Sequence, residues 1–359
     1  MAVSVFEGNT ADSKTFMPVV QRVRENFGLQ QVVMVGDRGM RAVVTRQKAI
    51  DALRESDGMG WITALKSGSI RALVEQGTLQ LGLFDERNLL ELESPDYPGE
   101  RLVACRNDAL AKLRTHKREE LLKATEVSLL EIKASVDAAK LSGQDKIGVR
   151  VGKIINKHKV AKHFELTITD AALAWVRRQD NIDAEAALDG LCIIRTSLSK
   201  AQMDAPTCVR NYKSLANVER AFRSLKTIDL KVRPIHHRLA DRVRAHILLC
   251  VLAYYVEWHM RQTWAPLLFA DTEQAAKATR DPVAPAVRSK SAQDKASSRS
   301  LPNGQPAHSF ATLLADLATI VRNTCRAPGA TSDSPTFNVL TSATPHQQRA
   351  LALINAIQL

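Results

Sequence analysis

The chain has 359 residues, of which 45% are hydrophobic and 25% charged, proportions typical of folded globular proteins and unlike those of disordered or membrane-embedded chains. It carries 50 Lys and Arg against 38 Asp and Glu, a formal charge of +12, which favours a polyanionic partner, nucleic acid before an anionic membrane. The longest apolar run, 247–256, has ten residues, whereas about 20 are needed to span a bilayer, so we expect a buried core helix and no membrane partner.

The five cysteines are scattered along the chain and show no spacing suited to zinc. We interpret them as free thiols in a reducing compartment. The N-terminus lacks the basic and apolar regions of a signal peptide. These features predict a cytoplasmic protein.

The first 66 residues alternate between strand-like and helix-like segments. Strands are expected at 2–6, 32–36 and 61–65, and helices at 14–28 and 45–56. This alternation predicts an α/β fold with a largely parallel sheet.

The pattern changes after residue 66. A Pro-Asp-Tyr-Pro-Gly turn within 88–108 predicts a hairpin, and a charged helix is expected over roughly 108–140. Residues 146–163 are basic, and strands are expected at 164–169 and 190–197. We interpret 67–197 as an inserted, partly β segment whose basic stretch faces either DNA or solvent.

The C-terminal half is expected to be mostly helical. Helices are predicted from 209 to about 266, and 198–266 forms the C-terminal part of the core. Residues 267–308 are rich in Ala, Ser, Asp, Lys and Pro, which predicts a disordered linker. Residues 309–359 are expected to form a short helical tail.

An acid follows the apolar run "VVMVG" at the point where the strand should end. Asp37, before Arg38 and Gly39, has the composition of an ordinary turn. Alternatively, it lies at the carboxyl end of a strand, where sites gather in α/β sheets. Carboxylates there suit Mg²⁺ or Mn²⁺, and two such ions are able to hold the attacking and leaving oxygens of a phosphodiester.

A second informative stretch is "YKSLANVERAFRSLK", residues 212–226. On a helix its apolar stripe comprises Leu215, Val218, Phe222 and Leu225. Tyr212, Glu219 and Lys226 are spaced seven apart, so they stack on one face at the edge of that stripe. An amphipathic helix with a solvated charged flank explains the same pattern.

Together, the two stretches resemble bacterial insertion-sequence transposases of the DDE type, which have an RNase H-like fold. The chain is most similar to the branch marked by Tyr-x2-Arg-x3-Glu-x6-Lys. Tyr212, Glu219 and Lys226 match that spacing, while Leu215 occupies the Arg position. "VGDRGM", "VERAFRSLKT" and "VRPIHHRLADRVRAHILLCVLAYY" also resemble this branch, so the likeness covers roughly residues 1–266.

The resemblance implies DNA strand cleavage and strand transfer at the ends of an insertion sequence, with transposon-end and target DNA as partners. It implies that Asp37 and Glu219 are catalytic and ligate Mg²⁺ (or Mn²⁺), and that Tyr212 and Lys226 hold the phosphate backbone. It also implies a homodimer in the synaptic complex and a bacterial, nucleoid-associated location. Leu215 stands where the family pattern has an Arg. We expect Arg223, about 40° round the helix from Glu219, to make the phosphate contact of that Arg.

Basic residues continue beyond this helix, including Arg233 and Arg238. Their density suits sequence-independent phosphate contacts with steep salt dependence, and a solvated basic face is the alternative.

The resemblance also requires a third acid on the first strand of the sheet. Only Glu7, Asp12 and Glu25 precede Asp37, and Asp12 is better explained as a helix cap. We therefore expect an RNase H-like core that lacks its first strands, in an N-terminally truncated chain that is inactive by itself. A non-catalytic DNA-binding remnant is the alternative function.

Overall fold

The computed structural model describes residues 4–10, 12–37, 59–80, 82–86, 88–228, 230–273, 280–329 and 331–357. The chain divides into two units. The N-terminal unit is Asn9–Leu215 with Asp281–Pro285, and the C-terminal unit is Met1–Gly8, Ala216–Arg280 and Ala286–Leu359. The predicted helix over 45–56 lies outside the described residues, and residues 4–6 of the strand predicted at 2–6 form no strand.

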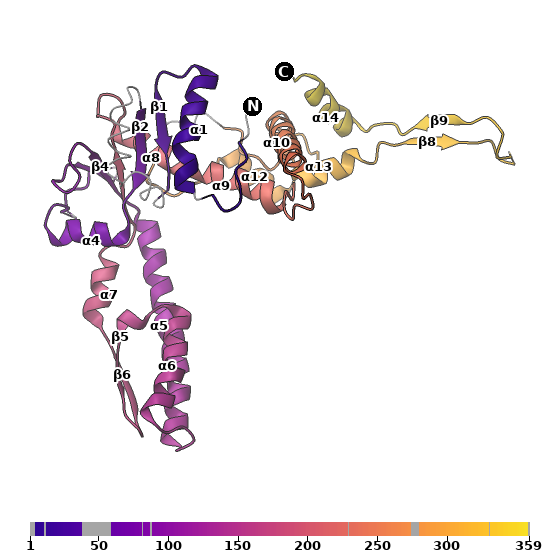
Figure 1. Ribbon diagram of the computed structural model, residues 1–359. Coiled ribbons are helices and arrows are strands. Elements are labelled where there is room, and N and C mark those ends of the chain that lie inside the picture. Colours follow the sequence, from indigo (N-terminus) through magenta and orange to yellow (C-terminus); the bar gives the residue numbers. More distant parts are fainter. Residues whose placement is uncertain are drawn as a thin grey trace. The chain divides into compact units, whose positions relative to one another are not determined.

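A five-stranded sheet in the order β1-β2-β7-β4-β3 forms the centre of the N-terminal unit (Figure 1). Its strands are β1 (Val32–Val35), β2 (Met59–Ala64), β3 (Leu89–Leu92), β4 (Arg101–Arg106) and β7 (Leu191–Thr196). Only β1 and β2 pair in parallel, and the other three neighbouring pairs of this sheet are antiparallel. The expected α/β class is confirmed as mixed α/β, but the prediction of a largely parallel sheet is wrong. The short β3–β4 turn is one reason, because parallel neighbours need a long crossover.

Helices cover both faces of this sheet. Alternate side chains of a strand point to opposite faces. Val103 and Cys105 therefore pack on the side of helix α8 (Ala205–Lys213), and Leu102 and Ala104 pack on the side of α4 (Ser67–Glu75). A third helix, α1 (Asp12–Phe27), brings Met17 into a small cluster with Trp61. The sheet is the middle layer of an α/β/α arrangement.

The segment between β4 and β7 forms a projecting part with its own core (Figure 1). Its elements are α5 (Asp108–Asp137), α6 (Gln144–His158), the 3₁₀ turn η1 (Ala161–His163), β5 (Phe164–Ile168), β6 (Leu173–Arg177) and α7 (Gln179–Ala186). Leu129 and Ile132 of α5 pack against Ile147 and Val151 of α6 and against Leu173. The insertion predicted over 67–197 differs from this arrangement, because β3, β4 and β7 belong to the central sheet.

Gly190, directly before β7, holds a backbone conformation that few other residues tolerate. Its φ is +75°, and a Cβ there would lie 2.3 Å from the backbone oxygen of Asn107. Because the left-handed conformation alone costs about 1–2 kcal/mol, Gly190→Ala is expected to lower the free energy of unfolding by more than about 2 kcal/mol, measured by urea denaturation.

Gly148→Ala is the matched control for this prediction. Gly148 lies inside α6, and a Cβ there would meet nothing within 4 Å. Alanine is favoured over glycine in a helix by about 0.5–1 kcal/mol, so this variant is expected to be as stable as the unaltered chain or slightly more so. Equal losses in both variants would contradict the role given to Gly190.

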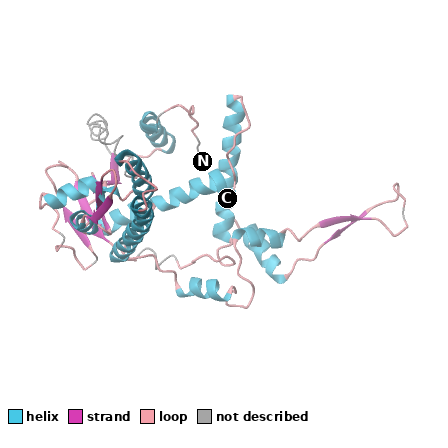
Figure 2. Cartoon of the chain, turned by 90° about the horizontal axis from the view of Figure 1, so that it is seen from below, coloured by secondary structure: helices cyan, strands magenta, loops and turns pink. Residues whose placement is uncertain are grey.

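The C-terminal unit is mostly helical. Its elements are α9 (Leu215–Arg223, whose first residue belongs to the N-terminal unit), a π-helical turn η2 (Ser224–Ile228), α10 (Ala240–Thr263), α12 (Lys290–Ser298), α13 (Phe310–Leu317), β8 (Arg322–Cys325), β9 (Phe337–Leu340) and α14 (Pro345–Asn355). Trp264, Leu267 and Leu313 are buried in its core, and the Trp264 indole donates to the Ala350 carbonyl at 2.9 Å. Both views show β8–β9 as a narrow two-stranded ribbon that extends away from α13 and α14 (Figures 1 and 2).

Two expectations for this unit differ from the structure. Within the predicted linker, 267–308, α12 is capped by Ser289 and buries Lys295, whose ammonium donates to the Ala270 carbonyl at 2.8 Å. The apolar run at 247–256 lies on α10, where Leu249 is 64% and Val256 50% exposed, so the expected burial is wrong for these side chains. Helix α12 was not predicted because its segment is rich in small residues. The exposure of Leu249 and Val256 was not predicted because a run of apolar residues does not specify which surface covers it.

Candidate functional site

Asp37 lies where the parallel pair β1–β2 ends. The Gly36 amide donates to the Ile62 carbonyl at 3.0 Å, and the buried Thr63 hydroxyl donates to the Asp37 carbonyl at 2.8 Å. These two bonds tie the backbone of the turn to β2, while the Asp37 side chain is exposed. The structure therefore places this carboxylate at the carboxyl edge of two parallel strands, as the sequence predicts.

The predicted helix over 212–226 is divided among three elements. Tyr212 is on α8 in the N-terminal unit, Glu219 is on α9, and Lys226 lies in the π-helical turn. Tyr212 packs against the core beneath α8, whereas Glu219 and Lys226 are exposed. The Lys226 ammonium lies 5.4 Å from the centre of the Phe222 ring, within the range of a cation–π contact.

The apolar stripe of this helix is more exposed than the sequence predicts. Val218 is 49% and Phe222 54% exposed, while Leu215 and Leu225 are half-buried. Helical spacing does bring Val218 and Phe222 to one side of α9. Glu219 was expected to border a buried apolar surface. That expectation is wrong for Val218 and Phe222, because both side chains are exposed.

Basic side chains gather after α9. Lys226, Lys231 and Arg233 line one open depression of about 680 Å³ together with Pro234 and Ile235. Arg238 is exposed before α10, and Arg223 is exposed on α9. The structure thus brings together Lys226 and Arg233 among the residues predicted to contact phosphate.

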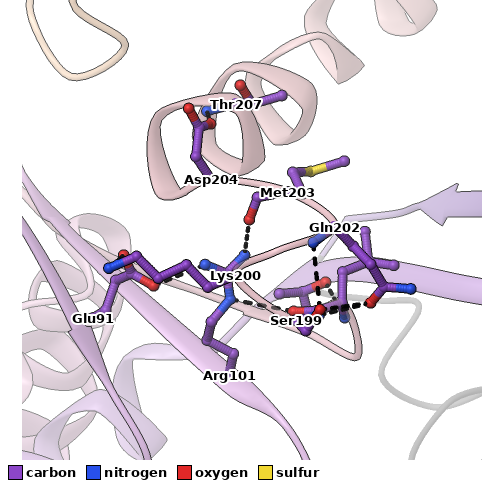
Figure 3. A network of polar contacts seen from close by, with 10 residues as sticks. Glu91, Arg101, Ser199, Lys200, Gln202, Met203, Asp204 and Thr207 are labelled. Carbon is purple, nitrogen blue, oxygen red and sulfur yellow. Dashed lines mark hydrogen bonds and ion pairs between the residues drawn. The ribbon is translucent and has the colours of Figure 1, made fainter.

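A polar network fixes the loop that leads from β7 to α8, and sequence reasoning missed it. Arg101 of β4 donates to the Leu198 carbonyl at 3.2 Å, to the Met203 carbonyl at 2.5 Å and to Glu91 at 2.7 Å (Figure 3). One guanidinium thus ties the sheet to both ends of the loop that positions the helix carrying Tyr212.

Asp204 begins that helix as its N-cap. Its carboxylate accepts a hydrogen bond from the Thr207 amide at 2.7 Å, as Figure 3 shows from close by. Hydrogen bonds from Thr207 hold the pKa of Asp204 below its usual value. The signal for this cap was present in the sequence, since Asp before Ala-Pro-Thr is a common helix start.

Arg101→Ala is expected to lower the free energy of unfolding by about 2–4 kcal/mol, because it leaves two carbonyls without their partner and Glu91 with Lys200, at 3.4 Å, as its remaining cation. Urea denaturation measures this loss. The control is Arg106→Ala on the same strand, where the side chain is 44% exposed and pairs with Asp108 at 3.2 Å. An exposed pair contributes at most about 1 kcal/mol, so a similar loss in both variants would contradict the network's role.

Asp37 and Glu219 have the donor chemistry that Mg²⁺ or Mn²⁺ prefers, because both are exposed carboxylates. They belong to different units. Across the described part of the chain, no group of three His, Cys, Asp or Glu side chains is placed to hold a metal ion. The residues fit such an ion by chemistry, and their convergence on one ion is a proposal.

Comparison with known proteins identifies the family of the chain. The sequence matches the family model for the transposase DDE domain over residues 1–256, a range that contains Asp37, Tyr212, Glu219 and Lys226. It matches no curated protein and no solved structure. Within the described ranges, no helix is both long and apolar enough to cross a membrane. The chain belongs to the family of transposases that carry a DDE domain.

Proposed function

We propose that this chain is a DNA transposase of the type whose RNase H-like core carries out metal-dependent strand cleavage and strand transfer of an insertion sequence, and that the chain is inactive by itself. The observation that carries the proposal is the position of Asp37 at the carboxyl edge of the parallel pair β1–β2, within the matched domain. Ligands bind at this edge in α/β sheets. Asp37 and Glu219 are the proposed catalytic metal ligands.

The proposed metal is Mg²⁺ or Mn²⁺, which supplies charge stabilisation to the attacking and leaving oxygens of a phosphodiester. Asp37 and Glu219 would contribute oxygen ligands to it. Tyr212, Lys226, Arg223, Arg233 and Arg238 are proposed to hold the phosphate backbone. The DNA partners are the transposon ends and the target, bound by a homodimer in the synaptic complex.

A second candidate function is DNA binding without chemistry. The formal charge of +12 and the basic depression around Lys226 favour it, because neither depends on a complete set of acids. Such binding weakens steeply with salt, because it releases counterions from the phosphate backbone.

One experiment separates the two candidates. The purified full chain is incubated with duplexes copied from the DNA that flanks its gene, with Mg²⁺, Mn²⁺ or EDTA. Metal-dependent nicking or joining supports the transposase and contradicts the expected inactivity of the chain alone. Salt-sensitive binding without cleavage supports the second candidate. Absence of both binding and cleavage would overturn both.

A further inference from the structure

A basic cavity lies in the N-terminal unit, and Asp37 is not among the residues that line it. Its volume is about 570 Å³, and α4, α5, η1 and the residues around α6 and α7 contribute to its lining. Two carboxylates, Glu185 and Asp189, line it, against six cationic side chains: Arg71, Arg114, Lys117, Arg118, Lys159 and Lys162. Like charges brought together from separate segments repel one another, so this wall favours an anionic ligand.

The two carboxylates are already engaged by the inner cations. Arg118, only 8% exposed, pairs with Asp189 and lies 3.7 Å from Glu185. Glu185 also pairs with Lys162, and it lies 3.2 Å from Nε2 of His163. Burial raises the pKa of Glu185, but Lys162 and the neighbouring cations outweigh it and hold that pKa below the usual value. Glu185 and Asp189 are thus engaged by Arg118 and Lys162 and do not pair with Arg71, Arg114 or Lys159.

The rim carries the unbalanced charge. Arg71, Arg114 and Lys159 are exposed, and no carboxylate of the described residues lies within ion-pair distance of them. The N-terminus of α4 adds to this field, since Ser67 and Gly68 line the cavity and no side chain caps the helix. A helix N-terminus presents free amides and a partial positive charge to an anion.

Two buried groups of the wall have incomplete bonding. Nδ1 of His163 and Nε of Arg118 are buried without a hydrogen-bond partner. His163 is 2% exposed, and burial holds its pKa below the usual value. An unsatisfied buried polar group costs about 1–3 kcal/mol. Both side chains line the cavity.

We propose that this cavity binds backbone phosphates of duplex DNA, as a contact separate from the basic depression at Lys226. The inference rests on the proposed action of the chain on DNA and adds a second surface to it. Sequence-independent contacts of this kind come from Lys, Arg and helix N-termini, the groups that the cavity presents.

The first test compares two double variants of the full chain that lose the same charge. Arg71→Gln with Arg114→Gln removes two rim cations. Lys112→Gln with Lys153→Gln removes two exposed lysines that do not line the cavity. Lys112 lies on α5 about 200° round the helix from Arg114. Fluorescence anisotropy measures the affinity for a random-sequence duplex between about 50 and 200 mM salt.

The rim variant is expected to bind at least about tenfold more weakly and to lower the slope of log K against log salt by about 2, one unit for each lost phosphate contact. The control variant is expected to keep the slope of the unaltered chain. Equal changes in both variants, or no change in the rim variant, would overturn the proposal.

Lysine acetylation with and without duplex DNA tests the location directly. Lys117, Lys159 and Lys162 are expected to be protected by DNA, whereas Lys146 and Lys153 of α6 remain reactive. Protection of all five lysines, or of none, would overturn the cavity as the contact. A chain that does not bind DNA at all contradicts the proposed function itself, whereas binding that is unaltered in the rim variant contradicts only the cavity.

Discussion

Asp37→Asn and Glu219→Gln are each expected to weaken Mn²⁺ binding by more than about 100-fold. Substituting the outer partners of a metal ligand costs roughly 10–100-fold in affinity, and removing a ligand's charge should cost more. Both changes keep the size of the side chain, and both side chains are exposed, so the fold should tolerate them. Mn²⁺ titration followed by electron paramagnetic resonance measures the affinity.

Glu25→Gln is the control for this measurement. Glu25 is an exposed acid on α1 that accepts a hydrogen bond from Gln21 at 3.1 Å, and the proposed site does not use it. It should leave Mn²⁺ binding unchanged. If Asp37→Asn and Glu219→Gln bound Mn²⁺ as tightly as Glu25→Gln and the unaltered chain, the assignment of Asp37 and Glu219 would be contradicted.

Glu100→Leu is expected to cost about 3–5 kcal/mol of stability, the largest loss among the stability variants. Glu100 and Arg195 form a buried pair, with side chains 5% and 4% exposed, and Arg195 Nε donates to the carboxylate at 2.5 Å. The same guanidinium lies 5.2 Å from the Trp61 ring centre and 4.9 Å from that of Tyr97. Removing Glu100 leaves a buried cation without its partner.

Two further variants isolate the cause of that loss. Glu100→Leu combined with Arg195→Met removes both charges and is expected to recover much of the lost stability. Asp137→Ala, which removes an exposed partner of Lys133 on α5, is expected to change stability by no more than about 0.5 kcal/mol. Urea denaturation measures all three, and a double variant no more stable than Glu100→Leu would contradict the unpaired charge as the cause.

Local patterns predicted much of the fold. The helix at 14–28, the strands that became β1 and β2, the β3–β4 hairpin and the long helix α5 all follow from spacing and turn residues, and the structure confirms them. These signals act within a few residues of one another. For the same reason they do not specify strand order, and β7 pairs between β2 and β4 although about 85 residues of chain separate β4 from β7.

In the candidate site, too, the features that depend on neighbouring residues were predicted, and those that join distant residues were not. The position of Asp37 after a strand was predicted because strand and acid are adjacent in the sequence. The Arg101 network was not, since it joins a strand to carbonyls about 100 residues away, and no local pattern marks such a pair. Part of the basic cavity, Lys159 and Lys162, lies in the basic stretch 146–163 that the sequence left open as facing DNA or solvent. The cavity itself was not predicted, because its other cations come from α4 and α5, and each segment by itself resembles a solvated charged face.

The most direct test of the central claim replaces Mg²⁺ with Fe²⁺ in the full chain and adds ascorbate and peroxide. Hydroxyl radicals formed at a bound iron cut the polypeptide beside it, so the fragments, identified by mass spectrometry, locate the metal without requiring activity. Cuts near residues 37 and 219 that Mg²⁺ suppresses, and that Asp37→Asn abolishes at both places, are the predicted result. Cuts at other positions, or cuts unchanged by Asp37→Asn, would contradict the claim that these two acids hold the metal.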